Sequence, residues 1–380
     1  MTAALMVILI VIVTALIFDF TNGFHDAANA MATSVATGAL TPKRAVTIAA
    51  ILNVVGAFLS TEVAKTISSG IVNDQLVTPD VVFAGLAAAI IWNLATWLFG
   101  LPSSSSHALF GGLIGAVLVS AGMAGIHASV IVSKILLPAV VAPLIAGLAA
   151  AMATRLAYRL TELPDGGGHS KVAQTVFKHG QRISASMVAL AHGTSDGQKT
   201  MGIITLVLIS GGYQASGTRP QFWVILAAGL AIGLGTYSGG WRIMRTMGRG
   251  LVDIEPPQGF AAETATTTAI LASSHLGFGL STTHVASGAI LGSGIGRRTQ
   301  VRWSTATRMA IAWVLTLPAA GIIGAAAALL TGLGLGGVLV SALLLAMAAY
   351  GFVKMSHRTK VTANNVNASR EVTVSVGAKS

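Results

Sequence analysis

The most constraining feature of this chain is the stretch Asn22-Gly23-Phe24-His25-Asp26-Ala27-Ala28-Asn29-Ala30-Met31, which places an aspartate where an apolar helix should continue. A charged side chain inside the hydrocarbon layer costs several kcal/mol and is normally retained for function. Asp26 follows the apolar run from Leu5 to Phe18 and therefore predicts a functional site. The Asn22-Gly23 pair is a turn signal, and we expect it to break the first helix so that a half-helix begins near Asp26.

Taken alone, the same stretch also fits an ordinary first span that ends at the headgroup boundary. The composition indicates a membrane protein in either case, because 53% of the 380 residues are hydrophobic and 9% are charged. Soluble domains have about 25% charged residues. No charged residue occurs between Val81 and Ser133 or between Met309 and Val353, and each stretch has room for about two helices of ~20 residues. The chain is predicted to be an all-α polytopic membrane protein.

The formal net charge of +11 is carried in short loops between the predicted spans. This is the positive-inside signal, and it differs from the basic stripe with interleaved aromatics that binds nucleic acid. We therefore expect the lipid bilayer, and no nucleic acid, as a partner. Because no Lys or Arg precedes Lys43, the N-terminus is predicted outside and the C-terminal tail in the cytoplasm, with the protein in the cell membrane. The absence of cysteine excludes disulfides and thiolate metal sites.

The chain divides into two halves around one polar segment. Residues 155–182 contain Pro164-Asp165-Gly166-Gly167-Gly168, so we expect a cytoplasmic linker loop there. This loop separates a first transmembrane repeat, residues 1–154, from a second, residues 183–355. The polar residues 356–380 are predicted to form a disordered cytoplasmic tail. Apolar runs predict spans at residues 1–20, 45–64, 81–99, 130–153, 221–240, 306–331 and 335–354.

Two motifs occur once in each half and in the same order, which predicts an internal duplication. Gly23-x-x-Asp26-x-x-Asn29-x-Met31 corresponds to Gly193-x-x-Asp196-x-x-Lys199-x-Met201. Likewise, Ser104-Ser105-Ser106-His107 corresponds to Ser281-Thr282-Thr283-His284. The first copy begins outside and the second follows the basic linker, so we predict two inverted-topology repeats with broken helices, as in secondary transporters. Such a fold would have roughly 10–12 transmembrane or re-entrant helices of span length.

The motifs suit an anion carrier. Four half-helix N-termini would present positive dipole ends and free N–H groups to an oxyanion. Asp26 and Asp196 would repel that anion unless a proton or a cation lay between them. A carboxylate can also accept a hydrogen bond from the P–OH of monohydrogen phosphate, which sulfate cannot supply at neutral pH. We therefore predict an ion-coupled carrier that prefers phosphate to sulfate.

The two motifs resemble the duplicated signature of the inorganic phosphate transporter (PiT) family, over nearly the whole chain. The resemblance implies symport of inorganic phosphate with sodium or protons. Glu263, in Gly259-Phe260-Ala261-Ala262-Glu263, also falls where the family has a glutamate. The resemblance implies a substrate site lined by Asp26, Asn29, Ser104, Ser105, Ser106, Asp196, Lys199, Ser281, Thr282 and Thr283.

Departures from the signature bear on the coupling ion. Sodium-coupled members resemble Gly-Ala-Asn-Asp-x-x-Asn-Ala in both halves, whereas this chain has His25, Ser195 and Lys199 at three of those asparagines. A lysine places a fixed positive charge where sodium would need oxygen ligands. The resemblance therefore favours the bacterial, proton-coupled branch, in which Ser195 alone is unusual. The residues expected to serve coupling are His25, Asp26, Asp196 and Glu263, and His107, His192 and His284 are further titratable candidates.

Several alternatives remain at this point. Sodium-coupled transport, sulfate transport and transport of divalent metal–phosphate complexes are all compatible with the motifs. A cation channel would leave the hydroxyl-rich segments unexplained. An intramembrane hydrolase using Ser281 and His284 is disfavoured because no Gly-x-Ser-x-Gly elbow occurs, so we expect no enzyme activity. We predict no cofactor and no dedicated metal site, and a homodimer is possible.

Overall fold

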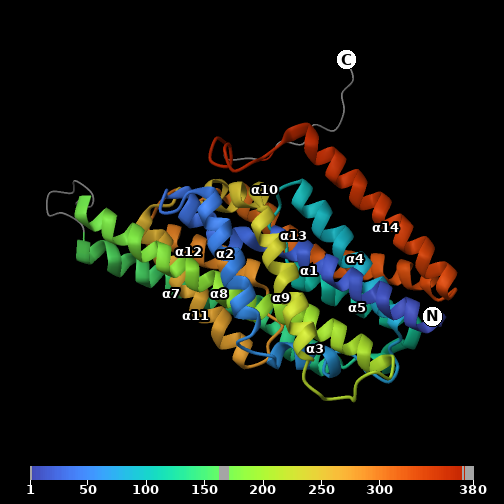
Figure 1. Cartoon of the computed structure of the whole chain (residues 1–380). Helices are drawn as coiled ribbons and strands as arrows, with labels where there is room; N and C mark the ends of the chain where they lie inside the picture. Colours follow the sequence, from blue (N-terminus) through green and yellow to red (C-terminus); the bar gives the residue numbers. More distant parts are fainter. Residues whose placement is uncertain (1, 162–170, 370–371, 373–380) are drawn as a thin grey trace.

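The computed structural model describes residues 2–161, 171–369 and 372, and these form an all-helical bundle (Figure 1). Short 3-10 helices cover Gly122–Gly125 and His357–Thr359, and π-helical turns cover Val132–Leu136 and Thr246–Gly250. The α-helices are α1 Ala3–Ala36, α2 Pro42–Ala57, α3 Glu62–Ser69, α4 Pro79–Leu98, α5 Ser105–Ala121, α6 Ala128–Ile131, α7 Leu137–Thr161, α8 Lys171–Ser210, α9 Phe222–Ser238, α10 Trp241–Arg245, α11 Pro256–His275, α12 Thr282–Arg297, α13 Trp303–Thr331 and α14 Leu335–Ser356.

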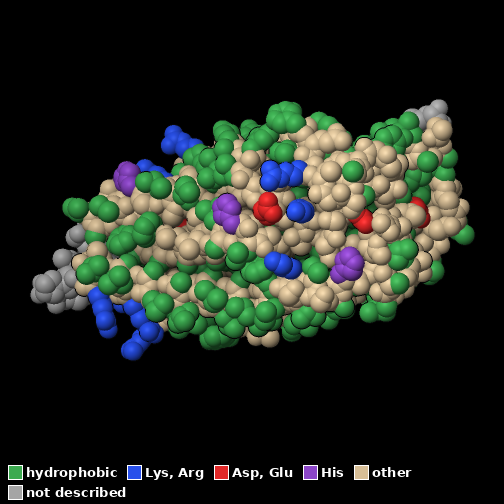
Figure 2. Space-filling view, turned by 90° about the horizontal axis from the view of Figure 1, so that it is seen from below, with side chains coloured by type: hydrophobic (Ala, Val, Ile, Leu, Met, Phe, Trp, Pro, Cys, Tyr) green, Lys and Arg blue, Asp and Glu red, His purple; other side chains and the backbone are tan. Residues whose placement is uncertain are grey.

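Six helical segments of the described residues are long and apolar enough to cross a membrane. Two bent pairs raise this number to eight if each pair is one span: α2 with α3, bent by 67°, and α9 with Trp241–Gly250, bent by 59°. The predicted span at 45–64 is therefore interrupted between Ala57 and Glu62. Hydrophobic side chains (green) and the backbone with other uncharged side chains (tan) cover most of the face in Figure 2, where charged side chains are few. The predicted all-α membrane fold is confirmed.

The predicted breaks in the two long motif helices are wrong. α1 runs without interruption through Asn22-Gly23, and α8 runs without interruption through residues 192–199. Glycine serves close packing here: a Cβ on Gly23 would lie 2.3 Å from Ile232 O of α9, and one on Gly193 would lie 2.2 Å from Asn53 O of α2. Helix contact at backbone distance requires a residue without a side chain. In α1, tertiary packing therefore outweighs the turn preference of the Asn22-Gly23 pair.

Helix packing repeats between the two halves. α1 packs on α9 while α8 packs on α2, and α5 packs on α13 while α12 packs on α7. The closest approaches match as well, since a Cβ on Gly115 would lie 1.9 Å from Gly321 O, and one on Gly292 would lie 1.9 Å from Gly147 O. In Figure 1, α1 begins at the right and α8 begins at the left, so the two motif helices run in opposite directions. This arrangement is the one expected of inverted repeats.

Two segments expected to lack structure are largely ordered. Residues 155–161 belong to α7 and residues 171–182 to α8, whereas 162–170 lie outside the described residues. Of the predicted tail, residues 356–369 fold back on the bundle, where buried arginine side chains donate to backbone carbonyl groups, and residues 370, 371 and 373–380 lie outside the described residues. Arg242 donates to Ser356 O at 2.8 Å, and Arg245 donates to Asn365 O at 2.6 Å. The polar composition of residues 356–369 predicted a segment exposed to solvent, but the contacts with Arg242 and Arg245 hold this segment against the bundle.

The close packing at the motif glycines can be tested by adding one methyl group. Gly23→Ala and Gly193→Ala should each lower the stability by at least about 1–3 kcal/mol, because the new Cβ overlaps a backbone carbonyl. Gly351→Ala is the matched control, because Gly351 is also helical and a Cβ there meets nothing within 4 Å. Thermal unfolding of the purified proteins in detergent measures the difference. Equal midpoints for Gly23→Ala and Gly351→Ala would contradict the packing argument.

Candidate functional site

Two helix N-termini, rather than the predicted four, reach the centre of the molecule. α5 begins after Ser104, whose Oγ accepts from His107 N at 3.1 Å, and α12 begins after Ser281, whose Oγ accepts from His284 N at 3.2 Å. These matched caps occupy the Ser104 and Ser281 oxygens, so the two serines orient the helix ends. The motif stretches of α1 and α8 lie within continuous helices and contribute side chains only. Positive dipole ends at the site therefore come from α5 and α12.

The Asp26 side chain is held by neighbours from α1 and α12. His25 Nδ1 lies 2.7 Å from Asp26 Oδ1, and Thr283 Oγ1 donates to the same oxygen at 3.3 Å. Asn29 Nδ2 donates to Thr283 Oγ1 at 3.0 Å and to Thr282 Oγ1 at 3.2 Å. All of these side chains are buried. The first motif and the second hydroxyl run thus meet directly, which no local pattern in the sequence could establish.

The other ring nitrogen of His25 reaches the first hydroxyl run and α4. His25 Nε2 lies 3.2 Å from Thr96 Oγ1 and 3.5 Å from Ser103 Oγ, while Ser105 Oγ lies 3.4 Å from Nδ1. A histidine held at both ring nitrogens keeps a defined orientation. Thr96 was not predicted, because an isolated threonine in an apolar helix carries no signal.

The Asp196 side chain carries the only buried Lys–carboxylate pair among the described residues. Lys199 Nζ lies 2.5 Å from Asp196 Oδ1 and also donates to Ser106 Oγ of α5. Thr282 Oγ1 donates to Asp196 Oδ2 at 3.3 Å. Lys199 is fully buried, so its charge has no water to stabilise it and depends on Asp196. The second motif therefore joins both hydroxyl runs.

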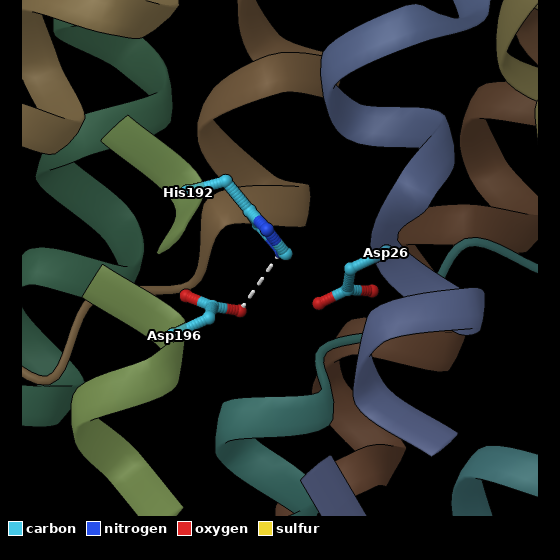
Figure 3. A group of neighbouring side chains, drawn as sticks. All are labelled: Asp26, His192 and Asp196. Atoms are coloured by element: carbon cyan, nitrogen blue, oxygen red, sulfur yellow. Dashed lines mark ion pairs between the residues drawn. The ribbon is translucent and has the colours of Figure 1, made fainter. Parts of the chain in front are cut away.

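Asp26, His192 and Asp196 meet at the centre, as Figure 3 shows, with one ligand atom of each lying within 4.8 Å of the others. His192 Nε2 lies 3.3 Å from Asp196 Oδ2, and its Nδ1 lies 3.1 Å from Asn53 Oδ1. This geometry leaves room for a proton or a cation between the carboxylates. Lys199 already places a positive charge on Asp196, however, and it opposes a second cation.

The sequence identifies His192 only as a further titratable candidate, without placing it in the site. Its spacing of four residues from Asp196 places both on one face of α8, and this was the available signal. Asn53 carried no signal, because its contact with His192 joins helices far apart in sequence. The hydroxyl of Ser195 is buried and has no hydrogen-bond partner among the described residues.

Glu263 forms a separate polar cluster. Its Oε1 accepts from Thr33 Oγ1 at 2.5 Å, from Ser34 Oγ at 2.6 Å and from Gln181 Nε2 at 3.2 Å, and its Oε2 accepts from Ser184 Oγ at 2.5 Å. Four neutral donors satisfy this buried carboxylate without a positive charge. Thr33 lies two turns beyond Asp26 on α1, about 10 Å along the helix. Glu263 is thus close to the central site but outside it.

Comparison with known proteins identifies the class. Residues 22–324 match the model of the phosphate transporter family. The chain belongs to the phosphate transporter family. A probable low-affinity inorganic phosphate transporter of Mycobacterium tuberculosis (strain CDC 1551 / Oshkosh) is 50% identical over 381 residues, covering 99% of this chain and 90% of that protein. The family resemblance is confirmed, and members of this family are transporters rather than enzymes.

Less similar proteins support the same family assignment. A probable low-affinity inorganic phosphate transporter of Bacillus subtilis (strain 168) is 39% identical, covering 86% of this chain and 98% of that protein. A solved structure named the sodium-dependent phosphate transporter superposes with a TM-score of 0.71 at 25% identity, covering 86% of this chain and 99% of that one. The fold and the broad class of substrate are therefore those of phosphate transporters.

The dependence of Lys199 on Asp196 can be measured as a coupling. Asp196→Asn and Lys199→Met should each destabilise the protein by about 3–5 kcal/mol, because each leaves one buried charge unpaired. The double variant Asp196→Asn/Lys199→Met should be more stable than either single variant, since both charges are then absent. Thermal unfolding without phosphate measures all four proteins. Additive losses in the double variant would show that the two charges do not depend on each other.

Proposed function

We propose that this chain imports inorganic phosphate across the cell membrane in symport with protons. The observation that carries the proposal is the position of Lys199, whose ammonium group lies against Asp196 at the centre of the site. The fixed charge occupies the place where sodium coupling would need an oxygen-lined cavity. A proton adds positive charge to such a site without needing a cavity of its own.

The donors around the centre suit a tetrahedral oxyanion. α5 and α12 begin beside it, and the first turn of a helix has backbone N–H groups without intrahelical partners and a positive dipole end, which suit an anion. Ser105, Ser106, Thr282 and Thr283 add hydroxyl groups, and Lys199 adds a positive charge. Asp26 and Asp196 lie beside these donors and can accept the P–OH of monohydrogen phosphate. We assign the phosphate site to these residues together with Asn29.

Protonation of the acidic cluster would link phosphate binding to the proton gradient. Asp26 and Asp196 share one buried space, so their negative charges oppose both each other and a dianion. His25 lies within 3.3 Å of Asp26, and His192 lies within 3.3 Å of Asp196. Each histidine can share a proton with its own carboxylate. Binding of phosphate and binding of protons would then favour one another. This mutual dependence is the requirement for symport.

The site lies where the two halves meet, so movement of one half against the other would expose it to each side in turn. The proposed boundaries are residues 1–154 and 183–355, with the N-terminus outside and the C-terminal segment in the cytoplasm. The opposite directions of α1 and α8 support this topology (Figure 1). We propose that the carrier alternates between an outward-open and an inward-open state, with phosphate held between α1, α5, α8 and α12.

A sodium-coupled mechanism is the second candidate, and the solved relative named the sodium-dependent phosphate transporter favours it. Transport of a metal–phosphate complex is favoured only by the cluster of Asp26, His192 and Asp196. Sodium coupling and metal–phosphate transport each require a metal cation beside the ammonium group of Lys199. Two positive charges close together in a buried site repel each other strongly. Proton coupling places no separate metal cation beside Lys199, because a proton that binds a carboxylate cancels a negative charge.

Transport in proteoliposomes separates these candidates. Radiolabelled phosphate should accumulate under an imposed proton gradient and not under a sodium gradient, and Asp196→Asn should abolish accumulation. Asp80→Asn is the control, because this acid lies in the first turn of α4, far along the chain from both motifs. Accumulation that requires sodium or a divalent metal would refute proton coupling, and no phosphate uptake under either gradient would refute the substrate.

Substrate selectivity follows from the P–OH group. An equimolar amount of sulfate should leave phosphate uptake nearly unchanged, because a buried carboxylate facing sulfate lacks its hydrogen bond, a loss of about 1–3 kcal/mol or roughly 5- to 150-fold in affinity. Arsenate has the same shape and protonation as phosphate and should compete well. Competition assays at neutral pH measure both anions. Equal inhibition by sulfate and arsenate would contradict recognition of the proton on phosphate.

A further inference from the structure

A second buried acid lies on α1, before the phosphate site. Asp19 is 0% exposed, and neither of its carboxylate oxygens has a hydrogen-bond partner among the described residues. Asn22, one turn further along, is also 0% exposed, and its amide nitrogen and oxygen are both unpartnered. Buried polar atoms are nearly always hydrogen-bonded, so four unpartnered atoms in adjacent turns require an explanation.

The surroundings of Asp19 are polar but supply no counter-charge at bonding distance. Its polar neighbours are the hydroxyl of Thr200 on α8 and the amide of Asn22, and Asp196 and Lys199 act on it from further along α8. The Thr200 hydroxyl is itself unpartnered. α4 and α9, which also pack on α1, carry only Asp80 and Tyr237 as titratable groups.

An ionised Asp19 is costly in this environment, because a buried carboxylate with no counter-ion at bonding distance has lost its hydration. Protonation removes that charge and gives the carboxyl group an O–H donor beside its acceptor oxygen. The O–H can donate to Asn22 Oδ1, and the carbonyl oxygen can accept from the Thr200 hydroxyl.

The position of this acid relates it to transport. Asp19, Asn22, Asp26, Asn29 and Thr33 follow one another at intervals of three or four residues, so they form one polar stripe on α1. Asp19 lies about 10 Å along the helix from Asp26, toward the N-terminus. Under the proposed topology this is the outer side of the phosphate site. The stripe thus leads from an outer acid to the central one.

We infer that Asp19, Asn22 and Thr200 form a second proton-binding site, at which one coupling proton binds on the outer side of the phosphate site. The inference rests on the proposed proton symport. Binding forms one O–H bond on the Asp19 carboxylate, and release toward the central cluster breaks it. No residue of the phosphate site belongs to this set, so proton loading and anion binding occupy different places on α1.

The test separates net transport from exchange in proteoliposomes containing the full chain. Asp19→Asn retains the shape of the side chain but cannot carry a proton. Phosphate accumulation driven by a proton gradient should fall to the level reached without a gradient, while exchange of internal for external phosphate should continue, because exchange moves no net proton. Asp19→Glu restores a titratable group and should recover accumulation. Asp80→Asn serves as the control for loss of an acid elsewhere.

Each outcome bears on a different claim. If Asp19→Asn accumulates phosphate as the wild type does under the same gradient, the second proton site is refuted while proton symport stands. If Asp19→Asn loses exchange as well, and still elutes as one folded species, Asp19 serves the site structurally and the inference is refuted. If wild-type accumulation requires sodium and Asp19→Asn abolishes that requirement, the occupant is sodium and the proton site is refuted. If the wild type shows no proton drive, the proposed function and this inference fail together.

Discussion

The structure depends on two carboxylates buried against each other in a membrane protein. Asp26 and Asp196 come from helices in different halves, and ligand atoms of the two lie within 4.8 Å. In a site without bulk water, such a pair is tolerable only with positive charge or protons nearby. Lys199 supplies the fixed charge, and His25 and His192 supply groups that can gain or lose a proton. In the proposed function, the surrounding hydroxyl and amide groups complete the site for monohydrogen phosphate.

Glycine packing between the halves brings these carboxylates together. Gly23 lets α1 lie directly on α9, and Gly193 lets α8 lie directly on α2. Gly115 and Gly292 do the same for α5 on α13 and α12 on α7. In each of the four pairs, a motif helix of one half packs on a helix of the other half. The site is therefore a product of the assembled chain, and neither half contains it alone.

α1 connects the polar features of the interior. Its stripe begins at Asp19, passes Asp26 at the centre, and ends at Thr33, which donates to Glu263. The three acids along this line differ in their surroundings. Glu263 accepts hydrogen bonds from four neutral donors, and Asp26 lies against a histidine. Asp19 has no hydrogen-bond partner among the described residues. Asp19 and Asp26 thus lie on α1 itself, whereas Glu263 lies on α11 and contacts the end of the stripe through Thr33.

The amino-acid sequence by itself determined the all-α membrane fold and the family, because apolar runs and recurring motifs are local patterns. Asn29, Ser106, Asp196, Lys199 and Thr283 lie together in the structure, and their role in binding phosphate stays a prediction. Tertiary structure alone decided that α1 and α8 are continuous, because the close approach of a neighbouring helix outweighs the turn preference of Asn-Gly. It also decided that Ser104 and Ser281 serve as caps, that His192 and Asn53 join the centre, and that Asp19 stands unpartnered. These depend on contacts between residues far apart in the chain, for which local sequence carries no signal.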